Sequence, residues 1–147
     1  MDTNFIQSEE FDIYNKIGED IIGCAFEIRR KVGRGLREKY YEAALAYELT
    51  KRGHKVERQV ELPAVYCGVV IDDSYYADII VDDKVIVEVK AIMTMKEAEC
   101  RQLLTYLKVS NYKLGYLINF GARDFRTGKF NDMLPYRHGI YRFVNRL

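Results

Sequence analysis

The stretch YYADIIVDDKVIVEVKA, residues 75–91, carries two carboxylates and a lysine at a spacing that suits metal-dependent chemistry. With a turn at residues 82–84, the apolar alternation favours a hairpin register that places Asp78 directly opposite Glu88 and Lys90 two residues further along the same face. Like charges at opposed positions destabilise a sheet unless a cation neutralises them. Mg²⁺ is a suitable cation because it prefers hard oxygen ligands such as carboxylates. The alternative is an exposed pair neutralised in solvent by Lys90 and neighbouring arginines.

This register also separates apolar from polar side chains. A slip of one residue would mix the two sets, so the hydrophobic pattern and the opposed carboxylates support the same pairing. We expect one face to be wholly apolar and the polar groups of the other to lie away from the core. The apolar face comprises Val81 opposite Val85, Ile79 opposite Val87 and Ala77 opposite Val89, and the other face comprises Ile80 opposite Ile86, Asp78 opposite Glu88 and Tyr76 opposite Lys90.

Helices and strands are predicted on both sides of this hairpin, in an order typical of an α+β or mixed α/β fold. Apolar residues at helical spacing predict helices over about residues 9–32, 36–52 and 96–108. Period-two alternation predicts an antiparallel meander over residues 56–62, 65–71 and 75–90, with breaks at Pro63, 67–68, 72–73 and 82–84. The C-terminal part is predicted to contain a buried strand at 114–119, a loop at 121–137 and an edge strand at 139–144.

Length and composition limit the class of protein. The chain has 147 residues, of which 48% are hydrophobic and 31% charged, so we expect one globular domain over residues 1–147. No apolar run approaches the roughly 20 residues of a membrane span, and the N-terminus is acidic where a signal peptide is basic, so we expect a cytoplasmic protein. Cys24, Cys67 and Cys100 lack CxxC spacing and are expected to be small buried side chains rather than zinc ligands or disulfides. His54 and His138 are isolated and are expected to be exposed.

Charge is distributed unevenly along the chain. Residues 1–28 carry seven acids and one base, a net −6, whereas residues 101–147 carry nine bases and two acids, a net +7. Such concentrations of positive charge suit a polyanion, because each neutralised phosphate releases counterions. A solvated surface balanced by acids elsewhere in the fold is the alternative. A second basic concentration, opposed only by Glu38, consists of Arg29, Arg30, Lys31, Arg34, Arg37 and Lys39.

The hairpin motif resembles that of a known nuclease group. Asp78, nine intervening residues and then Glu88-x-Lys90 resemble the PD-(D/E)XK nuclease motif. The stretch QLLTY supplies Gln102-x-x-x-Tyr106, which is similar to the QxxxY motif of the RecB-like branch. The resemblance covers roughly residues 13–120. It implies a restriction-endonuclease-like core, in which helices flank a mixed sheet with an antiparallel meander.

A third motif resembles that of one group within this superfamily. The segment GLREKYYEAAL contains Gly35-x-x-Glu38-x-x-Tyr41, which resembles the signature of the GxxExxY proteins in the same superfamily. A third metal-binding acid in the superfamily usually comes from the first core helix. Glu38 and Glu42 are four residues apart and share a helix face, so either is a candidate, and Glu42 is ranked first because Glu38 would also suit the helix N-terminus as a charge.

The resemblance also implies roles for individual residues. Asp78 and Glu88, together with the backbone carbonyl of Val89, are expected to bind Mg²⁺ or Mn²⁺, and Lys90 is expected to position or activate the attacking water. Two residues on the following helix would hydrogen bond to the lysine, a water or the phosphate, or else form the edge of the core: Gln102 and Tyr106.

The function that the resemblance implies is Mg²⁺-dependent hydrolysis of phosphodiester bonds in nucleic acid, with DNA favoured over RNA. Two alternatives stay open. One is a nucleic-acid-binding module that keeps the fold without turnover. The other is a protein-interaction domain whose long first helix docks a partner or a second copy, forming a homodimer.

Overall fold

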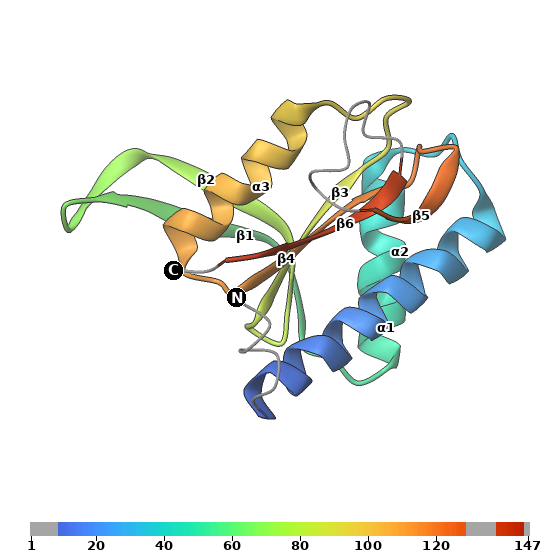
Figure 1. The fold of residues 1–147 in the computed structure, drawn as a ribbon, viewed down its shortest axis with the longest axis horizontal. Coiled ribbons are helices and arrows are strands. Elements are labelled where there is room, and N and C mark those ends of the chain that lie inside the picture. The colour runs from blue at the N-terminus through green and yellow to red at the C-terminus, as the bar shows by residue number, and fades with distance from the viewer. Residues whose placement is uncertain (1–8, 129–137, 146–147) are drawn as a thin grey trace.

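The structure, a computed structural model, describes residues 9–128 and 138–145, and in this part of the chain helices pack against one sheet (Figure 1). Two helices come first, three strands follow, and a third helix leads to the remaining strands. In chain order the elements are α1 (Glu9–Val32), α2 (Glu38–Lys51), β1 (Val56–Tyr66), β2 (Val69–Val81), β3 (Val85–Lys90), α3 (Glu97–Ser110), β4 (Leu114–Asn119), β5 (Asp124–Gly128) and β6 (His138–Val144).

One mixed sheet contains all the strands of the described residues, in the order β1-β2-β3-β4-β6-β5. β1, β2 and β3 form an antiparallel meander, and β4 returns parallel to β3 after α3. β6 is antiparallel to β4, and β5 is parallel to β6. The predicted mixed sheet with an antiparallel meander and flanking helices is therefore confirmed.

Helices cover both faces of the sheet. The apolar stripe of α1, with Ile21 and Cys24 at its centre, packs with α2 against one face, whereas α3 packs against the other. β3 is therefore buried on both sides: Val87 faces the α1–α2 core and Ile86 faces the α3 core. The prediction that the polar face of the hairpin lies away from the core is wrong, because α3 covers that face and buries Glu88.

β1 and β2 are longer than the alternation predicts. Both continue as strands through Pro63 and residues 72–73, where breaks were expected, and they form the long hairpin that reaches out to the left in Figure 1. Pro63 is tolerated because β1 is an edge strand, and a register shift follows it. The predicted turn at Cys67 and Gly68 is confirmed, and both residues have positive φ.

The C-terminal part also differs from expectation. The predicted loop over residues 121–137 contains β5, and the rest of that loop, residues 129–137, lies outside the described residues. The predicted edge strand is β6, which instead lies between β4 and β5. No helix within the described residues is long and apolar enough to cross a membrane. Cys24 and Cys100 are buried as expected, whereas Cys67 is exposed in the hairpin turn.

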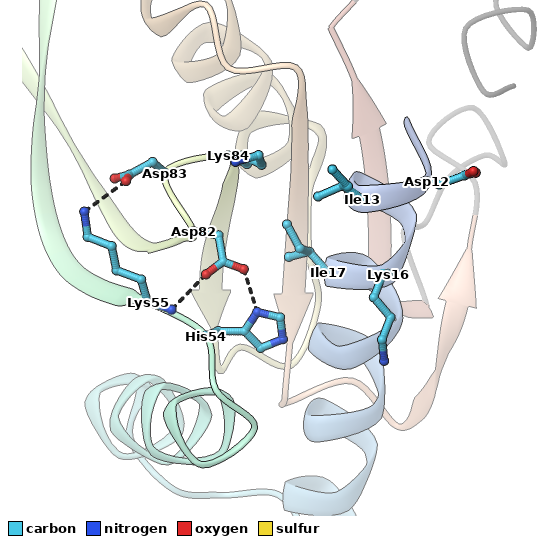
Figure 2. Close-up of a pocket in the computed structure, with 9 residues that line it drawn as sticks. All are labelled: Asp12, Ile13, Lys16, Ile17, His54, Lys55, Asp82, Asp83 and Lys84. Atoms are coloured by element: carbon cyan, nitrogen blue, oxygen red, sulfur yellow. Dashed lines mark hydrogen bonds and ion pairs between the residues drawn. The ribbon is translucent and has the colours of Figure 1, made fainter. Parts of the chain in front are cut away.

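His54 connects the first helix to the β2–β3 turn, contrary to the expectation of an exposed side chain. Its side chain is 11% exposed, with Nδ1 2.6 Å from Oδ2 of Asp82 and Nε2 2.7 Å from Oδ2 of Asp20 on α1. The other oxygen of Asp82 accepts a hydrogen bond from the backbone nitrogen of Lys55. His54 and Asp82 line a cavity of about 630 Å³. It lies between α1 and the turn (Figure 2). These bonds fix the turn that sets the hairpin register.

Candidate active site

The predicted hairpin register is confirmed near the turn. Ile79 pairs with Val87, Ile80 with Ile86 and Val81 with Val85. Asp82 and Asp83 have φ values of 55° and 56°, the left-handed conformation required by a tight hairpin turn. β2 and β3 pair at these three positions and then separate, which leaves a fork at Asp78 and Glu88.

Side chains replace backbone pairing at the fork. The backbone nitrogen of Asp78 donates to Oε2 of Glu88 at 3.1 Å, and the backbone nitrogen of Val89 donates to Oδ2 of Asp78 at 2.8 Å. Each carboxylate therefore reaches across to the other strand. The two acids converge between β2 and β3, as the opposed positions in the sequence indicate.

Burial makes both carboxylates difficult to ionise. Glu88 is 4% exposed, and its burial, with the negative charge of Asp78 in addition, raises its pKa to about 9. Burial also raises the pKa of Asp78, although the hydrogen bonds from Val89 and Gln59 oppose the shift. The positive charge of Lys90 lowers the pKa of both acids without cancelling the effect of burial. A divalent cation between them would favour ionisation of both.

Glu42 lies beside this pair and is the more buried of the two glutamates predicted on α2, at 3% exposed. Its Oε2 accepts a hydrogen bond from Nε of Arg58 at 3.0 Å, and its Oε1 accepts one from Nε2 of Gln59 at 3.1 Å. The same Gln59 nitrogen donates to Oδ1 of Asp78 at 3.0 Å. One amide therefore connects Glu42 to the hairpin. Glu38 is exposed in the first turn of α2 and takes no part in these hydrogen bonds.

The other predicted site residues divide between the fork and the surface. Lys90 is half-buried at the end of β3. Tyr106 on α3 is buried, and its ring contacts that of Tyr75. Burial raises the pKa of Tyr106 to about 12, and the negative charges of Glu88 and Asp78 add to this shift, so the hydroxyl lies near both acids. Gln102 lies one turn earlier on α3 and is exposed.

Asn119, a buried residue that the sequence did not single out, fixes the chain after Lys90. It pairs with Lys90 across β3 and β4, and its Oδ1 accepts hydrogen bonds from the backbone nitrogens of Ile92 and Gly121. Its amide nitrogen donates to the carbonyl of Ile92 at 3.0 Å. Its position at the end of the predicted strand LGYLIN, where the chain must turn, is the sequence signal that could have identified it.

The tyrosine of the GxxExxY motif has a structural role. The Tyr41 hydroxyl donates to the carbonyl of Gly33 at 2.7 Å and accepts from the backbone nitrogen of Leu36 at 3.2 Å. Its ring stacks on Phe120, with centroids 4.5 Å apart. Tyr41 therefore holds the connection between α1 and α2. It does not belong to the acidic cluster, which consists of Asp78, Glu88 and Glu42.

The acidic cluster has the oxygen donors that a divalent cation requires. Within residues 9–128 and 138–145, no group of three or more histidine, cysteine, aspartate or glutamate side chains is arranged tightly enough to hold a metal ion. Asp78 and Glu88 nevertheless bring two carboxylates to the same fork, and the amide of Gln59 connects Glu42 to Asp78. This donor set fits Mg²⁺ or Mn²⁺ better than a softer metal, because all its ligating atoms are oxygen.

Comparison with known proteins agrees with the fold. Searches among curated proteins and among solved structures found no significant match. A family model described as the PD-(D/E)XK nuclease superfamily matches residues 15–130, which include α2, the three-stranded meander, α3 and β4. The chain therefore belongs to the PD-(D/E)XK nuclease superfamily.

Proposed function

We propose that the protein is a metal-dependent nuclease that hydrolyses phosphodiester bonds in nucleic acid with Mg²⁺ or Mn²⁺. The observation that carries this proposal is the convergence of Asp78 and Glu88 at the fork, where burial and repulsion raise the pKa of both. Such an arrangement is unfavourable for the fold alone, and perturbed carboxylates of this kind concentrate at functional sites. Superfamily membership supports the same chemistry.

The metal ligands in this proposal are Asp78, Glu88, the backbone carbonyl of Val89 and Glu42 as the third acid. A divalent cation supplies neutralisation of charge on the phosphate and activation of the nucleophile. Lys90, at the end of the strand that carries Glu88, positions the water for attack on phosphorus. Tyr106 supports the site through its hydroxyl, and Gln102 contacts the substrate from the exposed side of α3. Glu38 is the weaker candidate for the third acid, because it is exposed.

Nucleic acid is the proposed partner, with DNA ahead of RNA. Positive side chains adjoin the acidic cluster: Nε of Arg58 hydrogen bonds to Glu42, and Nζ of Lys39 lies 3.6 Å from Oε1 of the same residue. Both cationic side chains also have exposed surface, at 42% and 67%. Arg34 and Arg37, which are exposed and precede α2, lie close to Lys39 in sequence, so a phosphate backbone would meet positive charge on its way to the fork.

Finer assignments are part of the same proposal. We place the chain among the GxxExxY proteins of the RecB-like branch, on the motifs Gly35-x-x-Glu38-x-x-Tyr41 and Gln102-x-x-x-Tyr106. We also propose that the chain acts as a single domain, supported by the one sheet that carries every described strand. The absence of disulfides among its three cysteines is compatible with the proposed cytoplasmic location. Homodimer formation stays a prediction, and light scattering tests it.

Cleavage assays test the proposal directly. Purified protein is incubated with single-stranded DNA, double-stranded DNA or RNA, each with Mg²⁺ or Mn²⁺ or with EDTA. We expect metal-dependent cleavage that is lost in Asp78→Asn and Lys90→Ala and kept in the matched controls Asp83→Asn and Lys84→Ala, which alter the turn at the other end of the hairpin. Cleavage that persists in Asp78→Asn contradicts the proposal.

A non-catalytic nucleic-acid-binding module is the second candidate. It is favoured by the hydrogen bonds that Arg58 and Gln59 make to Glu42, because they already satisfy a carboxylate that a metal would otherwise need to pair. Calorimetry distinguishes the two candidates. Salt-sensitive binding of DNA or RNA, without Glu88-dependent affinity for Mn²⁺, supports the binding module.

A further inference from the structure

The β1 strand changes face at Gln59. Side chains two or four residues apart on a regular strand share a face. Val56 packs against the α1–α2 core, yet Val60 and Leu62 pack against the α3 core on the opposite side of the sheet. The strand therefore turns over between Val56 and Val60.

The β2 strand changes face at Asp78, opposite Gln59. Ile79 belongs to the α1–α2 core, whereas Ala77 belongs to the α3 core, so the prediction that Ala77 shares a face with Ile79 is wrong. The β1–β2 register is the same on both sides of this point: Arg58 pairs with Ile79, and Val60 pairs with Ala77. Between Val56 and Pro63, only the pair of Gln59 with Asp78 is missing from the ladder. Both strands reverse together, and Asp78 is left free to point toward β3.

Gln59 has an unusual backbone conformation at this reversal. Its φ of 51° lies in the left-handed region, which is unfavourable for a residue with a side chain other than asparagine or aspartate. Backbone strain of this kind is unfavourable for folding and is concentrated at functional sites. The strained residue is also the one whose amide bonds to both Glu42 and Asp78.

We propose that Gln59 is a positioning residue that sets the spacing between Asp78 and Glu42 and so determines the affinity of the site for a divalent cation. The inference rests on the proposed metal-dependent function. Hydrogen-bond partners of metal ligands typically change metal affinity by about 10- to 100-fold when they are removed.

The chemistry of glutamine suits this role. Its amide nitrogen has two donor hydrogens and no charge, so it can bond to one oxygen of each acid without adding a positive charge of its own. Lysine or arginine at this position would neutralise that charge and compete with the metal. Asparagine is shorter by one methylene, and because Gln59 Nε2 lies 3.0 and 3.1 Å from its two partners, a shorter side chain cannot keep both bonds.

Replacement by glycine separates positioning from backbone strain. Gln59→Gly removes the amide but relieves the positive φ, so we expect the thermal stability of the metal-free protein to stay equal or rise. The affinity for Mn²⁺, measured by electron paramagnetic resonance of the free ion, should fall about 10-fold or more. Asn111→Gly is the matched control, because Asn111 also has a left-handed φ, of 62°, but lies at the end of α3. It should bind Mn²⁺ like the wild type.

The outcomes that contradict the inference can be distinguished from one another. Equal Mn²⁺ affinity in the wild type and Gln59→Gly contradicts the positioning role and leaves the nuclease proposal intact. Tighter binding of Mn²⁺ by Gln59→Gly would show that the amide competes with the cation, and this result also contradicts the positioning role. If the wild type does not bind Mn²⁺, both the proposed function and this inference are contradicted. If Gln59→Gly does not fold, Gln59→Asn, which tolerates the same φ, should show the loss of affinity instead.

Discussion

The backbone nitrogen of Asp78 donates to the carboxylate of Glu88, and the carboxylate of Asp78 accepts from the backbone nitrogen next to Glu88, that of Val89. This reciprocal exchange begins where β2 and β3 stop pairing. It holds two acids together inside a covered sheet, so the fork combines fixed geometry with unfavourable electrostatics. A fold that needed only stability would gain from neutral side chains at these positions.

Glu88→Gln should therefore stabilise the metal-free protein at neutral pH. The pKa of Glu88 is raised from 4.5 to about 9, so between these values the folded protein holds a proton that the unfolded chain has lost. The free energy of unfolding of the wild type should accordingly fall as pH rises through this range, at up to roughly 1.4 kcal/mol per pH unit. Glutamine keeps an oxygen to accept from Asp78 and does not ionise.

Urea unfolding in EDTA at pH 5, 7 and 8.5 measures this effect. The advantage of Glu88→Gln over the wild type should grow with pH and reach a few kcal/mol at the highest value. A variant that is less stable than the wild type at every pH would contradict this prediction, because it would show that the carboxyl group of Glu88 stabilises the fold.

Much of this fork follows from sequence, because strand register and side-chain alternation depend on local patterns. The turn at residues 82–84 and the opposition of Asp78 and Glu88 were predictable in this way. The burial of Glu88 was not, because the sequence does not state that α3 covers the second face of the hairpin. The reversal at Gln59 could not be predicted either, because the sequence around a glutamine does not indicate that its φ is positive.

The two glutamates of α2 should differ in their effect on metal affinity. Glu42→Gln removes the charge of the buried acid that is connected to Asp78 through Gln59, so Mn²⁺ affinity should fall about 10-fold or more. Glu38→Gln alters an exposed residue and should change the affinity less than about twofold, within the usual range of surface substitutions. Calorimetric titration of both variants makes the comparison. A larger loss in Glu38→Gln would transfer the role of third acid to that residue.

Tyr41→Phe should reduce stability and leave the chemistry of the site unchanged. The substitution keeps the ring that stacks on Phe120 but removes the hydroxyl that bonds to Gly33 and Leu36. Loss of these bonds should lower the free energy of unfolding by about 1 to 2 kcal/mol. Denaturant unfolding measures that change, and cleavage assays below the melting temperature check activity. Loss of activity in a fully folded Tyr41→Phe protein would place the hydroxyl in the chemistry instead.

His54 should contribute stability that depends on pH. Burial alone would lower its pKa, but the hydrogen bonds and charges of Asp82 and Asp20 reverse this effect and raise the pKa above 6.5. Its contribution is therefore complete below pH 6.5 and is lost as pH rises through the higher pKa of the folded state. Neutral imidazole has one donor and cannot donate to both carboxylates, which explains the loss.

His54→Gln tests this contribution by comparison with the wild type. At pH 6 the variant should be less stable by about 2 kcal/mol, and the gap should narrow at pH 9. The comparison between the two proteins cancels the titration of Glu88, which both contain. Direct titration of the His54 ring by NMR should give a pKa above 6.5, and a value below it would contradict this explanation.

The most direct test of the central claim is proton release on metal binding. If Glu88 is protonated in the metal-free protein and becomes a ligand, binding of Mn²⁺ at pH 7 should release about one proton per ion, measured by calorimetry in buffers of different ionisation enthalpy. Glu88→Gln should lose most of the affinity together with the proton release. Failure of the wild type to bind Mn²⁺, or equally tight binding by Glu88→Gln, would contradict the account.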